Sequence, residues 1–392
     1  MLLDWASREE IGSIRRDTSS VEHTTYELAV VDLRGHLMHF QRRKITWDLL
    51  VEKRFGLGKA LWLLGAPGRA CTRVAYSSVG DWTLAQWSRP AARAAHRYAS
   101  VPALLPRTGR IWEKSDVLPV PFHFYQPIVR SDDVAAWGVE DPLLGVDMRK
   151  RQQLELLGDL ARFRDEVAVL PMEAAPDGSE LYVDLAGQAY LSGDIETLYA
   201  MVRHLAPQTV LEVGCGASSR IIELALRANR EEGKQARHIC VEPYHAPWLE
   251  ELGVEVVRER VELLDQGVFS DLQANDILFI DTSHVVRHGG DVNFLYLRTL
   301  PALSEGVYVH VHDVFLPMDY PQEWLRDYKR FWTEQYLLQA FLAFNAQFEV
   351  VLAASYLATH HRDAMAQACP IMAGEPDSIP GSFWLRRKSF RG

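Results

Sequence analysis

Two short stretches place acidic residues beside histidines, each at the end of an apolar run. In "FIDTSH" Asp281 and His284 stand three positions apart, and "VYVHVHDVF" carries His310, His312 and Asp313. Carboxylates and imidazoles are costly to bury unless something pairs with them. Together they can move a proton or hold a divalent cation. We therefore treat both stretches as candidates for chemistry.

Two interpretations of these residues stay open. In the first, they are satisfied polar groups at strand ends, with His310 in particular in the core or supporting a neighbour. In the second, Asp281, His312 and Asp313 hold a divalent metal ion and His284 takes a proton from a substrate hydroxyl. Hydroxyls are very weak acids, so a reaction at their oxygen gains from a base and from a nearby positive ion.

A glycine-rich turn lies further upstream, in "VLEVGCGASSR" (210–220). Gly214 and Gly216 allow a tight turn and a close approach of the backbone to a ligand. Ser218 is expected at the start of the following helix, where free N–H groups can receive an anionic group. Glu212 precedes the turn inside the strand end.

Glu242 ends the next apolar run, 26 residues beyond Gly216. A carboxylate at that place can accept hydrogen bonds from both hydroxyls of a ribose. The third glycine of the dinucleotide fingerprint is missing, because Ser219 stands there. A Rossmann-like domain that binds another nucleotide remains an alternative.

Strand and helix signals alternate from residue 208 onward, which predicts a parallel sheet covered by helices. An amphipathic helix is expected before the first strand, at 193–207. The predicted strands are residues 209–215, 238–244, 254–260, 276–281, 307–315, 348–356 and 382–388. The acids and histidines follow the fourth and fifth of these strands, where open α/β sheets place their chemistry.

The glycine turn, Glu242 and the order of the elements resemble the class I S-adenosylmethionine-dependent methyltransferases. The resemblance implies an α/β fold with a Rossmann-like seven-stranded sheet that includes a late antiparallel strand. It also implies S-adenosyl-L-methionine as the cofactor. Glu212 and the turn at Gly214 and Gly216 would face its methionine part, and Glu242 its ribose.

"IDTSH", followed by an acid at the end of the fifth strand, is similar to the metal-dependent O-methyltransferases that modify deoxysugars of macrolide antibiotics. That similarity implies Mg²⁺ or Mn²⁺ at Asp281 and Asp313, with His284 as the base. His312 stands where the family has a glutamate, and an imidazole ligand favours softer ions than Mg²⁺.

The implied function is methyl transfer to a hydroxyl of a sugar or a glycosylated small molecule. An N- or carboxyl-directed methyltransferase and a catalytically silent cofactor-binding scaffold are the alternatives. The intact pair of Asp281 and His284 argues against a silent protein.

Two aromatic segments are candidates for substrate contact. "LPMDYPQEWLRDY" (316–328) reads either as a substrate-facing lid, in which Tyr320 and Trp324 stack on a sugar, or as ordinary packing. "FHFYQPI" brings His123 and Tyr125 close to a turn fixed by proline, where they could help to wall the active site.

Charge divides the 392-residue chain unevenly. Residues 41–114 hold 14 Lys and Arg against four acids, although the whole chain has a net charge of −10. We predict a basic, mainly helical accessory region at 1–117, a connecting or substrate-wall segment at 118–185, and the methyltransferase domain at 186–392. The stretch 47–65 could lie on an anionic membrane or dock as a helix on the acidic body or another subunit, and we favour docking.

Four widely spaced cysteines, Cys71, Cys215, Cys240 and Cys369, show no metal-ligand spacing, and we interpret them as buried thiols in a reducing compartment. The N-terminus lacks the pattern of a secretory signal, so we expect a cytoplasmic protein. No aromatic-basic motif indicates nucleic acid. The expected partners are a small-molecule or saccharide substrate and further copies of the chain in a homo-oligomer.

Overall fold

The computed structural model describes residues 29–31, 37–39, 91–96, 99, 105–130, 132, 134, 138–172, 181–183, 190–244 and 247–388. The chain divides into two compact units, Met1–Arg130 and Ser131–Gly392. The predicted stretch 47–65 and Cys71 lie outside the described residues. The predicted boundaries at 117 and 185 stay predictions.

Among its described residues, the first unit contains two short strands, a helical stretch at 91–96 and a longer helix. Strands β1 (Ala29–Val31) and β2 (Leu37–His39) pair antiparallel, a pair that the sequence did not predict. Helix α5 (Pro106–Lys114) begins at a proline in its first turn, where the missing N–H costs nothing.

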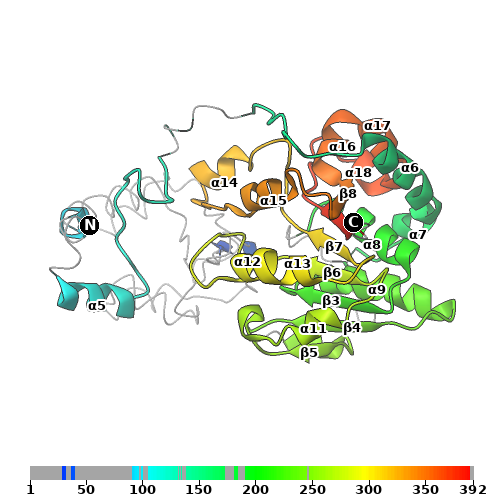
Figure 1. Cartoon of the computed structure of the whole chain (residues 1–392), viewed down its shortest axis with the longest axis horizontal. Helices are drawn as coiled ribbons and strands as arrows, with labels where there is room; N and C mark the ends of the chain where they lie inside the picture. Colours follow the sequence, from blue (N-terminus) through cyan, green and yellow to red (C-terminus); the bar gives the residue numbers. More distant parts are fainter. Residues whose placement is uncertain are drawn as a thin grey trace, which may run out of the picture. The chain divides into compact units, whose positions relative to one another are not determined.

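The second unit is built on a seven-stranded sheet in the order β5-β4-β3-β6-β7-β9-β8 (Figure 1). β9 pairs antiparallel with both of its neighbours, β7 and β8, and all other pairs in the sheet are parallel. The strands are β3 (Thr209–Val213), β4 (Arg237–Val241), β5 (Glu255–Val257), β6 (Ile277–Ile280), β7 (Tyr308–Val311), β8 (Phe348–Ala353) and β9 (Phe383–Arg387). All seven predicted strands, the late antiparallel strand and the Rossmann-like α/β class are confirmed.

Helices flank this sheet. Those that matter for the site are α8 (Asp194–Leu205), α9 (Ala217–Glu231), α12 (Asp291–Phe294), α14 (Gln322–Arg326) and α15 (Glu334–Leu342). The others are α6 (Lys150–Leu160), α7 (Arg164–Ala168), α10 (Pro247–Glu251), α11 (Gly267–Ser270), α13 (Leu300–Ala302), α16 (Ala354–His360), α17 (Arg362–Ala368) and α18 (Pro370–Ala373). The predicted helix at 193–207 is α8.

Buried residues gather into two clusters, one for each face of the sheet. Along β6, Ile277 and Phe279 belong to one cluster, whereas Leu278 and Ile280 belong to the other. This alternation follows from the two-residue period of a strand, and burial on both faces explains the continuous apolar run. A sheet buried in this way fixes the carboxyl ends of β3, β6 and β7 side by side.

Among the described residues, no helix combines the length and apolar character that crossing a bilayer demands.

Candidate active site

The glycine turn packs its backbone against the end of β6. Gly214 has a φ of +84°, and a Cβ there would come 1.7 Å from the carbonyl oxygen of Asp281. Only glycine fits that place. At Gly216, which precedes α9, a Cβ would meet no atom of the described residues within 4 Å. The turn is therefore tight on one side and open on the other, as a cradle for a ligand requires.

Glu242 lies half-buried beside this turn. Its Oε2 accepts a hydrogen bond from the backbone N–H of Cys215 at 3.3 Å, and its Oε1 accepts one from the N–H of Tyr244 at 2.8 Å. These bonds hold the carboxylate between the turn and the end of β4. The predicted ribose contact of Glu242 is consistent with this place and stays a prediction.

Glu212 and Ser218 contact each other below the turn. Both side chains are buried, and the Ser218 hydroxyl donates to Glu212 Oε1 at 2.6 Å. The other oxygen, Oε2, lies 3.0 Å from Nε2 of His238. Both oxygens therefore have protein partners. Direct contact of these two residues with a cofactor stays a prediction.

The acids and histidines of β6 and β7 converge on one point. His284 Nε2 lies 3.1 Å from Asp281 Oδ1 and 3.5 Å from Asp313 Oδ2. His284 and Asp313 both have a φ of +57°, a left-handed conformation that is uncommon outside glycine. Strand β7 ends at Val311, so Asp313 is freed from strand alternation and turns toward Asp281. Strained residues of this kind cluster at functional sites.

The second imidazole nitrogen of His284 is held by Glu334, the first residue of α15. Nδ1 lies 2.9 Å from Glu334 Oε2, and the backbone N–H groups of Thr333 and Glu334 both donate to the carbonyl oxygen of His284. The ring of Trp332 lies against the imidazole with centroids 4.2 Å apart. The sequence prediction missed Glu334, because an acid in the first turn of a helix is ordinary.

His312 lies at the inner side of the cluster. Its Nδ1 is 3.6 Å from a carboxylate oxygen of Asp281 and 3.6 Å from one of Asp313. Tyr190 stacks on its ring at 4.4 Å, and Nε2 faces Asp194 at 3.7 Å and has no hydrogen-bond partner in the part of the chain that the structure describes. Tyr190 and Asp194 carried no sequence signal.

His310 belongs to the core. It stacks on Phe279 with ring centroids 4.3 Å apart, and its Nε2 lies 3.0 Å from the Ser382 hydroxyl. Burial holds the pKa of His310 well below its usual value, so the ring is neutral. His310 therefore fits the first interpretation, a satisfied polar group in the core.

The carboxylates control the protonation of the other two histidines. Burial lowers the pKa of His284, but hydrogen bonds to Asp281 and Glu334 and the charge of Asp313 outweigh it and raise the pKa to about 10. The pKa of His312 is likewise raised well above its usual value, because the charges of Asp313 and Asp281 outweigh burial. Both rings are therefore imidazolium ions when no cation neutralises the acids.

The donor set fits a divalent cation. Asp281, His284 and Asp313 offer ligand atoms that all lie within 4.8 Å of one another. Two carboxylate oxygens with imidazole nitrogen suit Mn²⁺ and related ions. The predicted ligand His312 approaches the same two carboxylates, so either histidine could complete the site.

The predicted lid aromatics form a packed group around Trp332. Tyr320 is 8% exposed, and its hydroxyl accepts a hydrogen bond from the backbone N–H of Gln335 at 3.0 Å. Trp324 is half-buried on α14 and meets Trp332 edge-on at 4.8 Å. Tyr320 is thus mainly a packing residue, and Trp324 retains surface for a ligand. Their contact with substrate stays a prediction.

His123 and Tyr125 lie in the first unit. Both rings contact Phe124, at 4.2 and 4.3 Å between centroids, and Tyr125 is 81% exposed. Their proposed part in the wall of the active site stays a prediction.

Comparison with known proteins places the domain. Residues 211–314 match a family model described as a methyltransferase domain. No curated protein matches the chain.

Similar solved structures include the O-methyltransferase TomG of Streptomyces achromogenes in complex with S-adenosylmethionine (14% identity, 60% of this chain, 90% of that chain, TM-score 0.32). Another is a putative methyltransferase of Thermobifida fusca (17% identity, 64% of this chain, 97% of that chain, TM-score 0.34). A third is CalS11, a TDP-rhamnose 3'-O-methyltransferase of calicheamicin biosynthesis (13% identity, 65% of this chain, 98% of that chain, TM-score 0.33). Likeness at this level carries no conclusion about substrate.

The matched residues contain the glycine turn, Glu242 and both acid-histidine stretches, and they lie within the seven-stranded sheet whose last strand is antiparallel. This part of the chain therefore matches a methyltransferase domain and has the Rossmann-like seven-stranded fold.

Proposed function

We propose that this domain transfers a methyl group from S-adenosylmethionine to a hydroxyl of a sugar or a glycosylated small molecule, with His284 as the general base. The observation that carries the proposal is the setting of His284. Its Nδ1 is held by the buried Glu334, while its Nε2 points to the two half-buried acids Asp281 and Asp313.

Glu334 gives the imidazole a direction. A carboxylate bonded to Nδ1–H leaves the lone pair on Nε2, as in other base–carboxylate pairs, and stabilises the imidazolium that forms. His284 Nε2 accepts the hydroxyl proton while the oxygen–methyl bond forms and the methyl–sulfur bond breaks. The products are a methyl ether, the demethylated thioether and protonated His284.

The base must be neutral before it can act. Its pKa of about 10 keeps it protonated at neutral pH as long as Asp281 and Asp313 are uncompensated. A divalent cation on these two carboxylates would offset their charge, lower the pKa of His284 and stabilise the developing alkoxide. Asp281, Asp313 and His312 would hold that ion. The protonation state of His284 thus depends on whether Asp281 and Asp313 hold a cation.

Aromatic surface supports a saccharide acceptor. Trp332 lies against the His284 imidazole, and Trp324 meets Trp332 edge-on. Both tryptophans are half-buried, and the centre of each ring lies 5.0 Å from the Arg330 guanidinium. Flat aromatic faces with nearby polar groups suit ligands that are apolar on one side and polar on the other.

The test is transfer of isotope-labelled methyl from the cofactor to matched acceptors. One set comprises nucleotide sugars and glycosides, and the other their sugar-free counterparts. We expect label on a sugar oxygen, released only by cleavage of an ether. Label on nitrogen or in a base-labile ester would contradict a hydroxyl acceptor, and binding of the cofactor without transfer to any acceptor would indicate a silent scaffold.

A further inference from the structure

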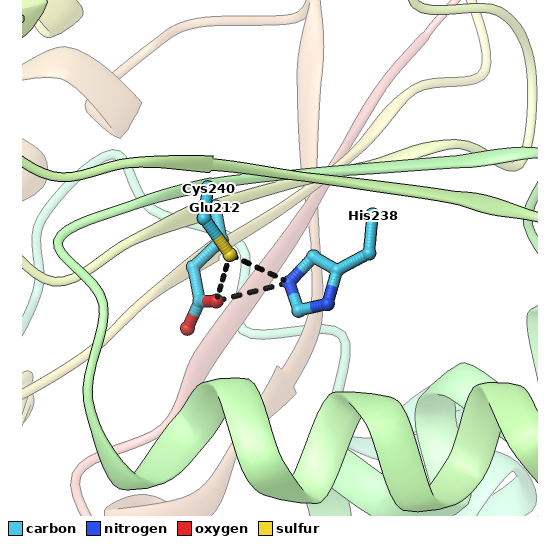
Figure 2. A group of neighbouring side chains, drawn as sticks. All are labelled: Glu212, His238 and Cys240. Atoms are coloured by element: carbon cyan, nitrogen blue, oxygen red, sulfur yellow. Dashed lines mark hydrogen bonds and ion pairs between the residues drawn. The ribbon is translucent and has the colours of Figure 1, made fainter. Parts of the chain in front are cut away.

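A second group of ligating side chains lies away from the proposed base, in the interior between β3, β4 and α9. Glu212 comes from β3, and His238 and Cys240 come from β4, with Glu212 and Cys240 directly paired across the two strands. All three are buried, and Figure 2 shows their ends meeting between the strands and a helix. Strand alternation places them on one face of the sheet.

The three atoms form a nearly regular triangle. Glu212 Oε2 is 3.0 Å from His238 Nε2, and Cys240 Sγ is 3.4 Å from each of these two atoms. Zinc bonds of about 2.0–2.3 Å in a tetrahedron separate such ligand atoms by about 3.4–3.6 Å. The observed spacing therefore matches one face of a zinc tetrahedron to within about 0.4 Å.

The surrounding residues hold these ligands as a zinc site requires. His238 Nδ1 lies 3.1 Å from Glu223 Oε1, and Arg230 donates to the other oxygen of Glu223 at 2.9 Å. A ligating histidine nearly always gives its second N–H to a carboxylate in this way, which directs the lone pair of Nε2 toward the metal. Ser218 occupies the remaining oxygen of Glu212.

The glycine turn contains a candidate for the fourth ligand, Cys215. The Cys215 Sγ lies 3.8 Å from the carbonyl oxygen of Glu212 and 3.9 Å from that of Val241, so a second thiol stands beside the strands that carry the cluster. Thiolates with an imidazole select zinc over Mg²⁺ or Ca²⁺.

We infer that Cys215, Glu212, His238 and Cys240 bind a structural zinc ion that fastens the cofactor turn to β4. The ion replaces the protons of the two thiols and of His238 Nε2, and the four protein ligands close the site to water. In that state the Glu212 carboxylate serves the metal. Its predicted contact with the methionine part of the cofactor then belongs to the backbone of the turn instead.

The experiment measures metal in the full chain, purified after expression with added zinc and dialysed against a weak chelator. We expect about one zinc per chain. Replacement by Co²⁺ should give an intense near-ultraviolet thiolate-to-cobalt absorption. The proposed catalytic cluster has no thiol, so this band reports only the buried site.

Variants separate the two sites. Cys240→Ser should abolish the cobalt band and most of the bound zinc. The control Cys369→Ala, which removes another buried thiol, and Asp313→Asn, which alters the other cluster, should both retain them. If Cys240→Ser does not fold, the wild type still decides: removal of zinc by a strong chelator should make two thiols newly reactive.

Wild-type protein that takes up no zinc and shows no thiolate–cobalt band would overturn the proposal. So would zinc that is lost from Asp313→Asn and kept by Cys240→Ser. Neither result would bear on methyl transfer by His284, because the two sites share no residue.

Discussion

The two acid-histidine clusters of this domain are built from similar residues but differ in access. At the end of β6 and β7, the side chains of Asp281 and Asp313 are 28% and 18% exposed. Between β3 and α9, the side chains of Glu212 and His238 are 0% and 1% exposed. The first cluster can meet a substrate and the second cannot. Exposure, more than residue type, separates the proposed chemistry from the proposed structural role.

The two clusters also differ in backbone conformation. His284 and Asp313 stand in loops with positive φ, whereas Glu212, His238 and Cys240 lie within regular strands. Strain of roughly 1–3 kcal/mol at a non-glycine residue persists only where the surroundings enforce it.

His284→Asn should lower turnover by roughly 10²–10⁴, the usual contribution of a positioned base. Cofactor affinity, measured by calorimetry, should change little, because the imidazole faces the acids and the proposed acceptor. His288→Ala alters an exposed histidine in the same loop and serves as the comparison. A large loss from His288→Ala with near-normal turnover in His284→Asn would move the base to His288.

Removal of the divalent ion should lower turnover almost as much as His284→Asn does. Without it, the raised pKa of His284 leaves about 10⁻³ of the ring neutral at pH 7. Activity should fall in excess chelator and return with Mg²⁺ or Mn²⁺, and Asp313→Asn should raise the metal concentration needed. Full activity in chelator, together with no metal bound by Asp313→Asn or wild type, would leave Asp281 and Asp313 as structural acids.

Glu334→Gln should reduce turnover by about 10²-fold, since an amide at Nδ1 can no longer stabilise the imidazolium that forms. Glu334 is a positioning residue, so its replacement should also shift the pH at which activity rises to lower values. The pH profile distinguishes this role from simple packing, which would leave the profile in place.

The sequence predicted the sheet well because strand signals are local. Apolar runs such as 276–281 end in polar residues, and parallel strands bring those ends together, so the meeting of Asp281, His284 and Asp313 followed from order alone. Glu334 lies 50 residues from His284 in sequence and could not be paired with it without the path of α15.

The buried cluster escaped prediction for a related reason. Cys240 and His238 read as ordinary strand residues, and their spacing from Cys215 matches no metal-binding motif. Their approach to Glu212 depends on the exact register of β3 on β4, which pairs Glu212 with Cys240 and Val210 with His238. A shift by one residue would turn both β4 side chains to the opposite face.

Glu242→Ala tests the cofactor side of the domain. Loss of hydrogen bonds from a charged carboxylate to the ribose should weaken S-adenosylmethionine binding by about 1.5–3 kcal/mol, or roughly 10- to 150-fold. Turnover at saturating cofactor should stay within a few-fold of wild type. Unchanged affinity by calorimetry would show that Glu242 only braces the backbone of Cys215 and Tyr244.

The smallest effect concerns stability in the absence of metal. The pKa of His284 is about 10 in the folded protein against about 6.5 when unfolded, so the folded state binds the proton more tightly. The stabilisation is therefore complete below about pH 6.5 and is lost as pH rises toward 10. In chelator, the melting temperature of wild type should fall by several degrees more than that of His284→Asn between pH 6.5 and 10, because the variant has no proton to lose there. His312 is present in both proteins and cancels from the difference. Parallel melting curves for the two proteins would mean that the carboxylates do not hold His284 as an imidazolium, and that the base is neutral without any cation.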